Sequence, residues 1–296
     1  MIHYEQCPVC SGKNIQPFLQ VKDYTVSQEI YSLYKCSDCG FVFTQDVPSQ
    51  EEIGKYYQSQ NYISHSDTQQ GIVNKLYHKV RKITLAGKRK LVVLQTGLSK
   101  GSLLDVGCGT GAFLNEMKTA GWDITGLEPD DTARKNAKEL YGIEPKPSHE
   151  LFELTAESFD AITMWHVLEH VHQLNEYVSQ LNKLLKPQGV LFIAVPNYTS
   201  GDADHYKEYW AAYDVPRHLY HFSPNSMKLL MKKHGMEVKE IMPMWFDSIY
   251  VSMLSEQYKN GKGNIISAAW NGLASNAKTL FNKERCSSLI YIIKKS

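Results

Sequence analysis

The sequence predicts an α/β protein with a doubly wound, mostly parallel sheet, preceded by a small metal-binding module and a helical connector. From residue 101 onward, apolar strand-like runs alternate with helix-like segments, and a Gly-rich loop directly follows the first run. Two closely spaced CxxC pairs near the start predict the module. We therefore expect residues 1–45 to form the module, residues 46–98 the connector and residues 99–296 the α/β domain.

Composition sets limits on the class of protein. The 296 residues are 43% hydrophobic and 21% charged, with a formal net charge of +1. This balance suits one α/β domain with a small appendage, and it disfavours nucleic acid as the main partner. The start lacks the features of a signal peptide, and no apolar run approaches the ~20 residues that span a bilayer. We expect a cytoplasmic protein without a membrane partner; the sequence does not predict its oligomeric state.

Four of the six cysteines form the pairs Cys7–Cys10 and Cys36–Cys39. Four thiolates in two tight turns match the tetrahedral ligand set of Zn²⁺. All four coordination positions would be filled by protein, so we expect a structural zinc ion, in a segment too short for a stable core of its own. Reduced, unligated cysteines and a dithiol redox site are the alternatives.

The connector contains one expected helix. Apolar residues from Ile72 to Ile83 recur at helical spacing, which predicts a helix from about residue 70 to 95. Its other face is rich in lysine and arginine, and we favour a solvated face over a phosphate-binding patch. Before this helix, aromatic residues that include Tyr62, together with His65, either close over a ligand or join the two domains.

The α/β domain is expected to contain strands and helices in alternation. The expected strands are 102–106, 122–128, 159–165, 190–195, 236–241 and 289–293. The expected helices are 112–120, 130–142, 174–185 and 223–235. A further strand is expected between residues 143 and 154, although Pro145 and Pro147 interrupt it. Residues 247–285 are predicted to be a helical insertion, at a position common for a substrate lid.

The Gly-rich loop follows the first strand and contains Gly107, Gly109 and Gly111, with Asp105 two residues upstream. The spacing formally satisfies the dinucleotide fingerprint, and Glu128 suits ribose hydroxyls of either a dinucleotide or another nucleoside cofactor. The Asp105 carboxylate would repel a pyrophosphate and favour a ligand with a positively charged amino-acid end. S-adenosylmethionine is such a ligand.

Four segments, LLDVGCGTGAFL, GLEPD, FDAITMWHVLEHV and LLKPQGVLFIAVPN, follow one another between residues 100 and 245. In order and spacing the chain resembles class I S-adenosylmethionine-dependent methyltransferases of types 11, 12 and 23. With its CxxC pairs and PRHLYHFSPNS, it is similar to a bacterial subgroup with a zinc-ribbon-like module, some of whose members are thought to methylate sugars or other small metabolites. The cofactor-binding residues that we assign on this basis are Asp105, Gly107, Cys108, Gly109, Gly111, Phe113, Glu128, Pro129, Trp165 and His166.

An alcohol acceptor needs its proton removed, and histidine suits this role near neutral pH. We predict His218 as this base, because it follows the fifth strand where related methyltransferases place a histidine. Bracing of the loop by hydrogen bonds is the alternative. His221 is the second candidate, with a structural or cofactor-facing role as its alternative, and His170 is assigned to packing of the cofactor wall. Arg217 could hold an anionic substrate, cap a helix or pair with Asp214.

The leading interpretation is a methyltransferase that acts on a hydroxyl group or carbon of a small metabolite, with a sugar or nucleotide-linked sugar favoured. An RNA methyltransferase that uses the zinc module for recognition is the second, although the balanced charge gives it little support. A zinc-ribbon interaction protein with a non-catalytic methyltransferase fold is the third. An oxidoreductase that binds a nicotinamide dinucleotide is the last.

Overall fold

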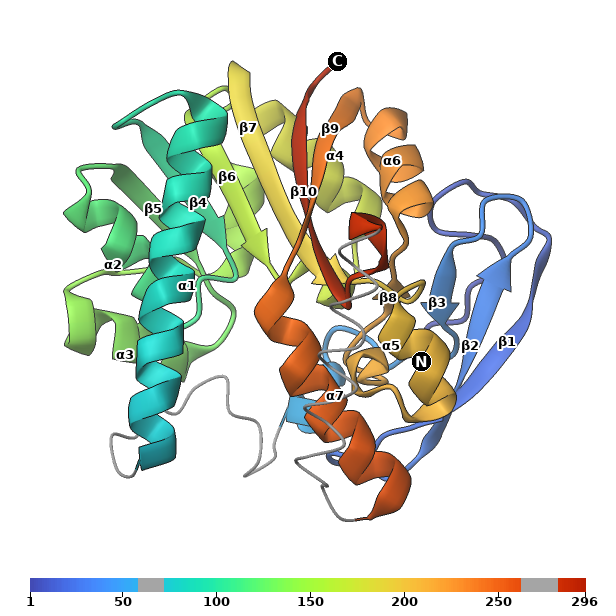
Figure 1. The fold of residues 1–296 in the computed structure, drawn as a ribbon. Helices are drawn as coiled ribbons and strands as arrows, with labels where there is room; N and C mark the ends of the chain where they lie inside the picture. Colours follow the sequence, from blue (N-terminus) through green and yellow to red (C-terminus); the bar gives the residue numbers. More distant parts are fainter. Residues whose placement is uncertain (58–71, 262–281) are drawn as a thin grey trace.

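The computed structural model describes residues 1–57, 72–261 and 282–296, which form two sheets and their surrounding helices (Figure 1). The larger sheet has six strands, in the spatial order β5-β4-β6-β7-β10-β9. Their bounds are β4 Ser102–Val106, β5 Asp123–Leu127, β6 Phe159–Trp165, β7 Leu185–Pro196, β9 Met236–Pro243 and β10 Ser288–Lys295. Strands β5, β4, β6 and β7 are parallel, whereas β10 runs antiparallel to both of its neighbours. The predicted α/β fold is confirmed.

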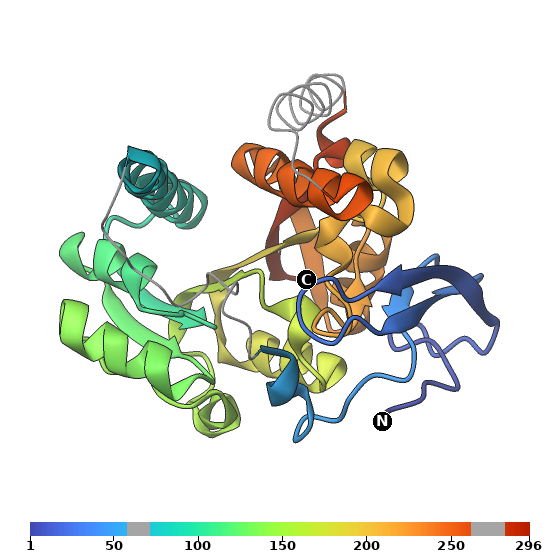
Figure 2. The same ribbon diagram turned by 90° about the horizontal axis from the view of Figure 1, so that it is seen from below.

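Helices cover both faces of this sheet, as Figure 2 shows from below. Leu103 and Leu104 are consecutive in β4 and point to opposite faces, where they join two separate apolar clusters. The first cluster includes α1 (Ile72–Thr96) and α2 (Ala112–Thr119), and the second includes α4 (Leu174–Leu184) and α6 (Pro224–Lys233). Burial of both faces explains the nearly continuous apolar run of β7.

Local signals fix the ends of several helices. The carboxylate of Asp130 accepts a hydrogen bond from the Ala133 N–H (2.7 Å) and caps α3 (Asp131–Tyr141), which ends at the left-handed Gly142. Ser223 caps α6 through a capping box, and Pro224 is its first residue. Both helices therefore begin where the sequence predicts.

The strand expected between residues 143 and 154 is absent. Lys146 makes a single parallel bridge to Leu127, and residues Ser148–Glu153 form a 3-10 helix instead. Pro145 and Pro147 flank Lys146 and have no N–H group to donate, so the ladder cannot extend past this one residue. Strand β5 is therefore an edge strand of the large sheet.

The connector helix is confirmed as α1, but its faces differ from the expectation. Ile83 is 55% exposed, whereas Leu91 and Val92 are buried against the sheet. The basic face is not simply solvated, because the Nζ atom of Lys88 lies 4.2 Å from the centroid of the Trp165 ring. Tyr62 and His65 lie outside the described residues, as do residues 262–281 of the expected insertion; the described part of the insertion contains α7 (Trp245–Asn260).

None of the helices that the structure describes has both the length and the apolar character needed to cross a bilayer.

The smaller sheet combines β1, β2 and β3 of the N-terminal region with β8, which comes from the segment after β7 and α5 (Gly201–Tyr206). Its strands are β1 Ile15–Lys22, β2 Ile30–Cys36, β3 Val42–Thr44 and β8 Tyr220–His221. Val42 pairs with His221, and Phe43 pairs with Tyr220. The segment that carries His218 is therefore joined to the N-terminal strands; the division at residues 45 and 98 stays a prediction.

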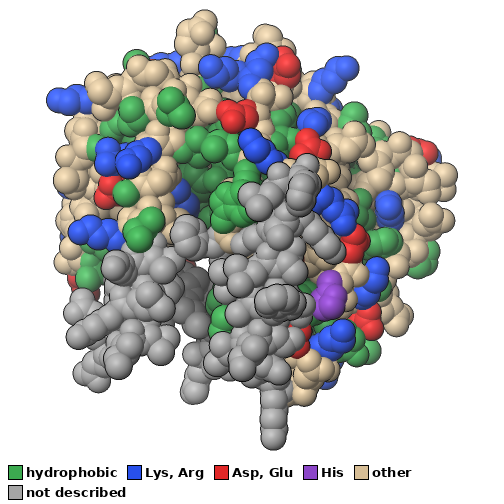
Figure 3. Space-filling view, in the orientation of Figure 1, with side chains coloured by type: hydrophobic (Ala, Val, Ile, Leu, Met, Phe, Trp, Pro, Cys, Tyr) green, Lys and Arg blue, Asp and Glu red, His purple; other side chains and the backbone are tan. Residues whose placement is uncertain are grey.

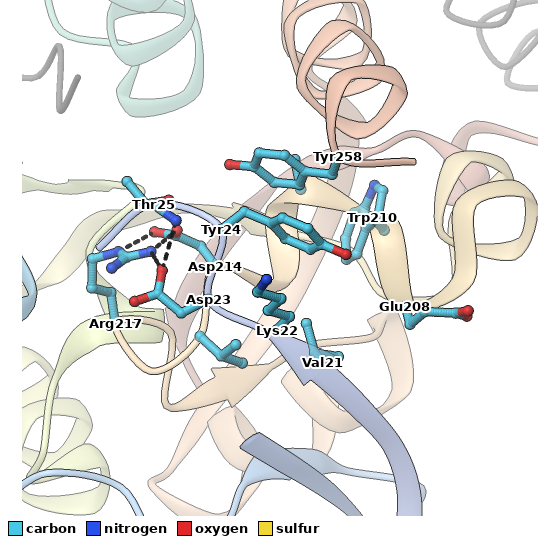
Figure 4. A pocket seen from close by; sticks show the side chains of 12 residues that line it. Val21, Lys22, Asp23, Tyr24, Thr25, Glu208, Trp210, Asp214, Arg217 and Tyr258 are labelled. Carbon is cyan, nitrogen blue, oxygen red and sulfur yellow. Dashed lines mark hydrogen bonds and ion pairs between the residues drawn. The ribbon is translucent and has the colours of Figure 1, made fainter. Parts of the chain in front are cut away.

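A buried ion cluster fixes this junction. The guanidinium of Arg217, 1% exposed, lies 2.6 Å from Asp214 and 3.0 Å from Asp23 (Figure 4). It also donates to the Tyr56 carbonyl. Pairing with Asp214, one of the three roles considered for Arg217, is confirmed. Although burial raises the pKa of both carboxyls, Arg217 holds each below its ordinary value. The two carboxylates paired with Arg217 therefore stabilise the fold at neutral pH, and this contribution is lost as the pH falls through their pKa values.

We predict that Asp23→Asn lowers the free energy of unfolding by about 3 kcal/mol, because it leaves the buried guanidinium with a single carboxylate. Urea denaturation at pH 7 measures the change. Asp46→Asn is the matched control, since Asp46 pairs with His3 at the surface and should cost less than about 1 kcal/mol. Equal stabilities of the two variants would show that the Asp23–Arg217 pair does not hold the junction.

Candidate functional site

The Gly-rich loop connects β4 to α2 at the carboxyl edge of the large sheet. Gly107, Gly109 and Gly111 have φ angles of 71°, 55° and 77°, which side-chain-bearing residues rarely adopt. A Cβ atom on Gly107 would lie 2.4 Å from Cγ2 of Val167, whereas one on Gly109 would meet no atom within 4 Å. Gly107 is thus required by packing, and Gly109 leaves the backbone open to a ligand.

Glu128, just after β5, holds this loop in place. One carboxylate oxygen accepts from the Gly109 N–H (2.8 Å) and the other from the Asp130 N–H (3.0 Å). A carboxylate offers about four lone-pair sites, which makes Glu128 a residue of the type that binds a ligand's hydroxyl groups. Pro129 is fixed by its carbonyl, which accepts from Arg134 at 2.9 Å.

Asp105 is buried and accepts a hydrogen bond of 2.6 Å from the Thr163 hydroxyl. Burial raises the pKa of Asp105 to about 7, although Thr163 and Lys88 lower it. Near neutral pH the carboxyl is therefore only partly ionised. The electrostatic argument from the sequence assumed a full negative charge, so the field that favours a cationic ligand is weaker than predicted. Lys88, whose pKa burial lowers to about 8, is a second charge that the sequence did not place here.

The remaining residues assigned to the cofactor lie around this loop. The ring of Phe113, in α2, packs edge-on against Trp165 at the end of β6, with centroids 5.7 Å apart. Cys108 packs beside Gly126, where an added Cβ would lie 3.0 Å from its sulfur. Because these residues come from the carboxyl ends of β4, β5 and β6 and from α2, the structure brings the assigned set to one edge of the sheet.

His166 forms an ion pair on each side of its ring. Nε2 lies 2.8 Å from Asp247 of α7, and Nδ1 lies 3.4 Å from Glu169. Burial lowers the pKa of His166, but these two carboxylates outweigh it and raise the pKa to about 10. The ring is therefore an imidazolium at neutral pH. No pattern near His166 points to Asp247, which lies about 80 residues later, in α7 between β9 and β10.

His218 and His170 face each other, with ring centroids 4.6 Å apart. His218 donates through Nδ1 to the Ala212 carbonyl (2.9 Å), and Nδ1 of His170 lies 3.0 Å from the Arg217 carbonyl and 3.0 Å from the Tyr57 hydroxyl. Burial and the neighbouring His218 lower the pKa of His170 to about 4, so this ring is neutral. Sequence reasoning assigned His170 to packing and did not single out Glu169, which lies beside both rings.

His221 lies in β8 rather than in this group. Its Nε2 atom is 3.1 Å from the Thr44 hydroxyl, and its ring packs edge-on against Tyr213. Burial, together with His218, holds the pKa of His221 well below its ordinary value. These contacts keep His221 inside the small sheet.

The four cysteines of the CxxC pairs meet at one point. Their sulfur atoms all lie within 4.8 Å of one another, with 3.5 Å between Cys7 and Cys39 and 3.6 Å between Cys10 and Cys36. Sulfur atoms around a tetrahedral zinc ion lie about 3.8 Å apart. In each pair the first cysteine's carbonyl accepts from a backbone N–H four residues later, the tight turn expected of a metal-binding knuckle. The donor set and its geometry thus fit zinc.

Known proteins share parts of this arrangement. The ubiquinone biosynthesis O-methyltransferase of Actinobacillus pleuropneumoniae serotype 7 is 38% identical over 115 residues, which cover 35% of this chain and 49% of that protein. The mitochondrial ubiquinone biosynthesis O-methyltransferase of Homo sapiens is 28% identical over 164 residues, 49% of this chain and 44% of the relative. The chain thus spans about half the length, or less, of these curated relatives.

Among solved structures, one from Galdieria sulphuraria, assigned as a sarcosine dimethylglycine methyltransferase, has a TM-score of 0.53. It is 16% identical and covers 75% of this chain and 88% of its own, which shows a shared fold. The family model described as a methyltransferase domain matches residues 77–241, more than half of the chain. That range includes the Gly-rich loop, Glu128, His166 and His218, so the residues at the sheet edge are those of a family member: the chain belongs to the methyltransferase domain family.

Proposed function

We propose that the chain is an S-adenosylmethionine-dependent methyltransferase that methylates a hydroxyl group of a small molecule. The observation that carries this proposal is the bond from the Gly109 N–H to Glu128, at a loop position where an added Cβ would meet no other described residue within 4 Å beyond its chain neighbours. A carboxylate fixed in this way can accept both hydroxyl groups of a cofactor ribose. Family membership and the O-methyltransferase names of the relatives support the same reaction.

The bound cofactor would supply an electrophilic methyl group, and the chain would mainly bind and align the two reactants. Glu128 would hold the ribose, and Pro129 would border the adenine. Trp165 and Phe113 would form an apolar wall that excludes water, since their rings already pack against each other. Asp105 would face the amino-acid end of the cofactor, with the Thr163 hydroxyl orienting its carboxyl group.

His218 is the residue that we propose for removal of the acceptor's proton. Its Nδ1–H donates to the Ala212 carbonyl, so in the neutral ring Nε2, which lies 4.0 Å from Asp214, carries the lone pair. We propose no catalytic role for His221, because its ring is bonded within the small sheet.

The acceptor is proposed only as a small hydroxylated molecule. The relatives carry names from ubiquinone biosynthesis, which give no support to the sugar that the sequence analysis favoured. RNA is disfavoured as well, because on the face drawn in Figure 3 the described Lys and Arg side chains are scattered among acidic and apolar ones rather than gathered into one basic surface.

We predict that Glu128→Gln weakens S-adenosylmethionine binding about 10- to 100-fold, because each hydrogen bond to a charged group contributes about 1.5–3 kcal/mol. Isothermal titration calorimetry measures the affinity. Glu139→Gln, an exposed glutamate on α3, is the matched control and should bind as the wild type does. Binding of NAD(H) but not of S-adenosylmethionine to the wild type would replace this proposal with the oxidoreductase, and binding of neither would favour the non-catalytic interaction protein.

We predict that His218→Asn lowers kcat at least about 100-fold while S-adenosylmethionine affinity is unchanged, since a general base contributes about 10²–10⁴-fold. The assay uses labelled S-adenosylmethionine with the first acceptor found in a screen of small phenols and nucleotide sugars. The exposed His149 provides the control variant His149→Asn, which should turn over normally. A full rate in His218→Asn would exclude His218 from the reaction.

We predict that the chain purified from metal-replete cells retains one zinc ion through dialysis, and that Cys10→Ser loses it. Inductively coupled plasma mass spectrometry measures the metal content. Cys108→Ser makes the same chemical change outside the cluster and should keep the zinc. A wild-type chain that holds no zinc would remove the structural metal from this proposal.

A further inference from the structure

The four cysteines of the CxxC pairs differ in their access to solvent. Cys10 is exposed, whereas Cys7, Cys36 and Cys39 are only 1%, 0% and 7% exposed. The Gly12 N–H donates to the Cys10 sulfur at 3.4 Å, and a Cβ atom on Gly12 would lie 3.3 Å from that sulfur. The glycine therefore leaves this side of the sulfur open. A small oxidant in solution reaches Cys10 before it reaches the other three cysteines.

A partner for an oxidised Cys10 is already in place. The sulfur of Cys36, in the other knuckle, lies 3.6 Å from the Cys10 sulfur. A disulfide bond is about 2.05 Å long, so the two sulfurs need to approach each other by about 1.5 Å. Cys7 and Cys39 form the second pair across the knuckles, with 3.5 Å between their sulfurs. A disulfide between Cys10 and Cys36 thus leaves two thiolates for an ion that takes four ligands.

We propose that Cys10 is an oxidation site for hydroperoxides, and that its oxidation expels the zinc ion from the cysteine cluster. This inference rests on the structural zinc of the function proposed above. The Cys10 thiolate attacks the hydroperoxide, so that an S–O bond forms, the O–O bond breaks and water or an alcohol leaves with a proton from solvent. The Cys36 thiolate then attacks the sulfur of the sulfenic acid, the S–S bond forms, and hydroxide leaves as water with a second proton. The two sulfurs lose two electrons in all, and one hydroperoxide accepts them.

The bonds that attach the two knuckles to the large domain do not depend on the cysteine sulfurs. The Val9 carbonyl of the first knuckle accepts from Lys233, and the Gly40 carbonyl at the end of the second accepts from Tyr198. The new disulfide also joins one knuckle to the other. We therefore expect oxidation to remove the ion without unfolding the chain, and a thiol reductant with added zinc to reverse it.

Zinc-loaded, full-length protein treated with one equivalent of hydrogen peroxide tests this site. A chromogenic chelator measures the released zinc, and mass spectrometry of alkylated peptides identifies the first disulfide. We expect zinc release together with a disulfide between Cys10 and Cys36, and recovery of the zinc after dithiothreitol and zinc are added. Cys108→Ser and Cys286→Ser are the matched controls and should release zinc at the wild-type rate, because neither residue belongs to the cluster.

Cys10→His keeps a zinc ligand that a hydroperoxide does not convert to a disulfide, so this variant should release zinc at least about 10-fold more slowly. Release at the wild-type rate from zinc-loaded Cys10→His would overturn the proposal, as would a first disulfide in the wild type that lacks Cys10. The disulfide of the wild type decides the question if Cys10→His does not bind zinc. A wild type that holds zinc and keeps it in excess peroxide refutes the oxidation site and leaves the structural zinc, whereas a reduced wild type without zinc refutes both.

Discussion

The geometry of the site depends on the buried ion cluster of Arg217 with Asp23 and Asp214. Asp23 is itself fixed in the turn after β1, where its carboxylate accepts from the N–H groups of Thr25, Val26 and Ser27. The guanidinium thereby ties the N-terminal strands to the segment before β8. The carbonyl of the same Arg217 accepts from His170, so the residue that joins the modules also sets the hydrogen position on a ring of the site.

This connection gives the cysteine cluster an influence on the site without any contact with substrate. The Pro8 carbonyl accepts from Asn175 of α4 and the Val9 carbonyl from Lys233 of α6, so the first knuckle is bonded to the large domain as well. The second knuckle leads directly into β3, which pairs with β8. An ion that fixes both knuckles would therefore also restrain the strand that follows His218. A metal held by these four cysteines would thus act on the position of the segment around His218.

The sequence predicted those features that depend on neighbours along the chain. Periodicity and residue types at fixed offsets predict the caps of α3 and α6, the Gly-rich loop and the succession of strands β4 to β7 along the chain. Features that depend on distant contacts were missed. No local pattern marks Asp247 as the partner of His166, or places β8 beside β3, because each contact joins segments that are far apart in the sequence. The strand expected between residues 143 and 154 is a different case. The sequence shows the two prolines that prevent this strand from forming, and their effect outweighs the preference for a strand at this place in the alternation.

The neighbours of each side chain, rather than its residue type, decide the charges at the sheet edge. Within the five residues HVLEH, His166 lies between two carboxylates and is cationic, while His170 lies against His218 and a backbone carbonyl and is neutral. Burial raises the pKa of Glu169, but the neighbouring His166 imidazolium outweighs burial and holds this pKa below its ordinary value. A free pair of histidines would share one pKa near 6.5. The fold separates their pKa values to about 10 and about 4, so that a fixed positive charge and an unprotonated nitrogen coexist at neutral pH, four residues apart. That separation follows from the neighbours of each ring, and not from the presence of histidine as such.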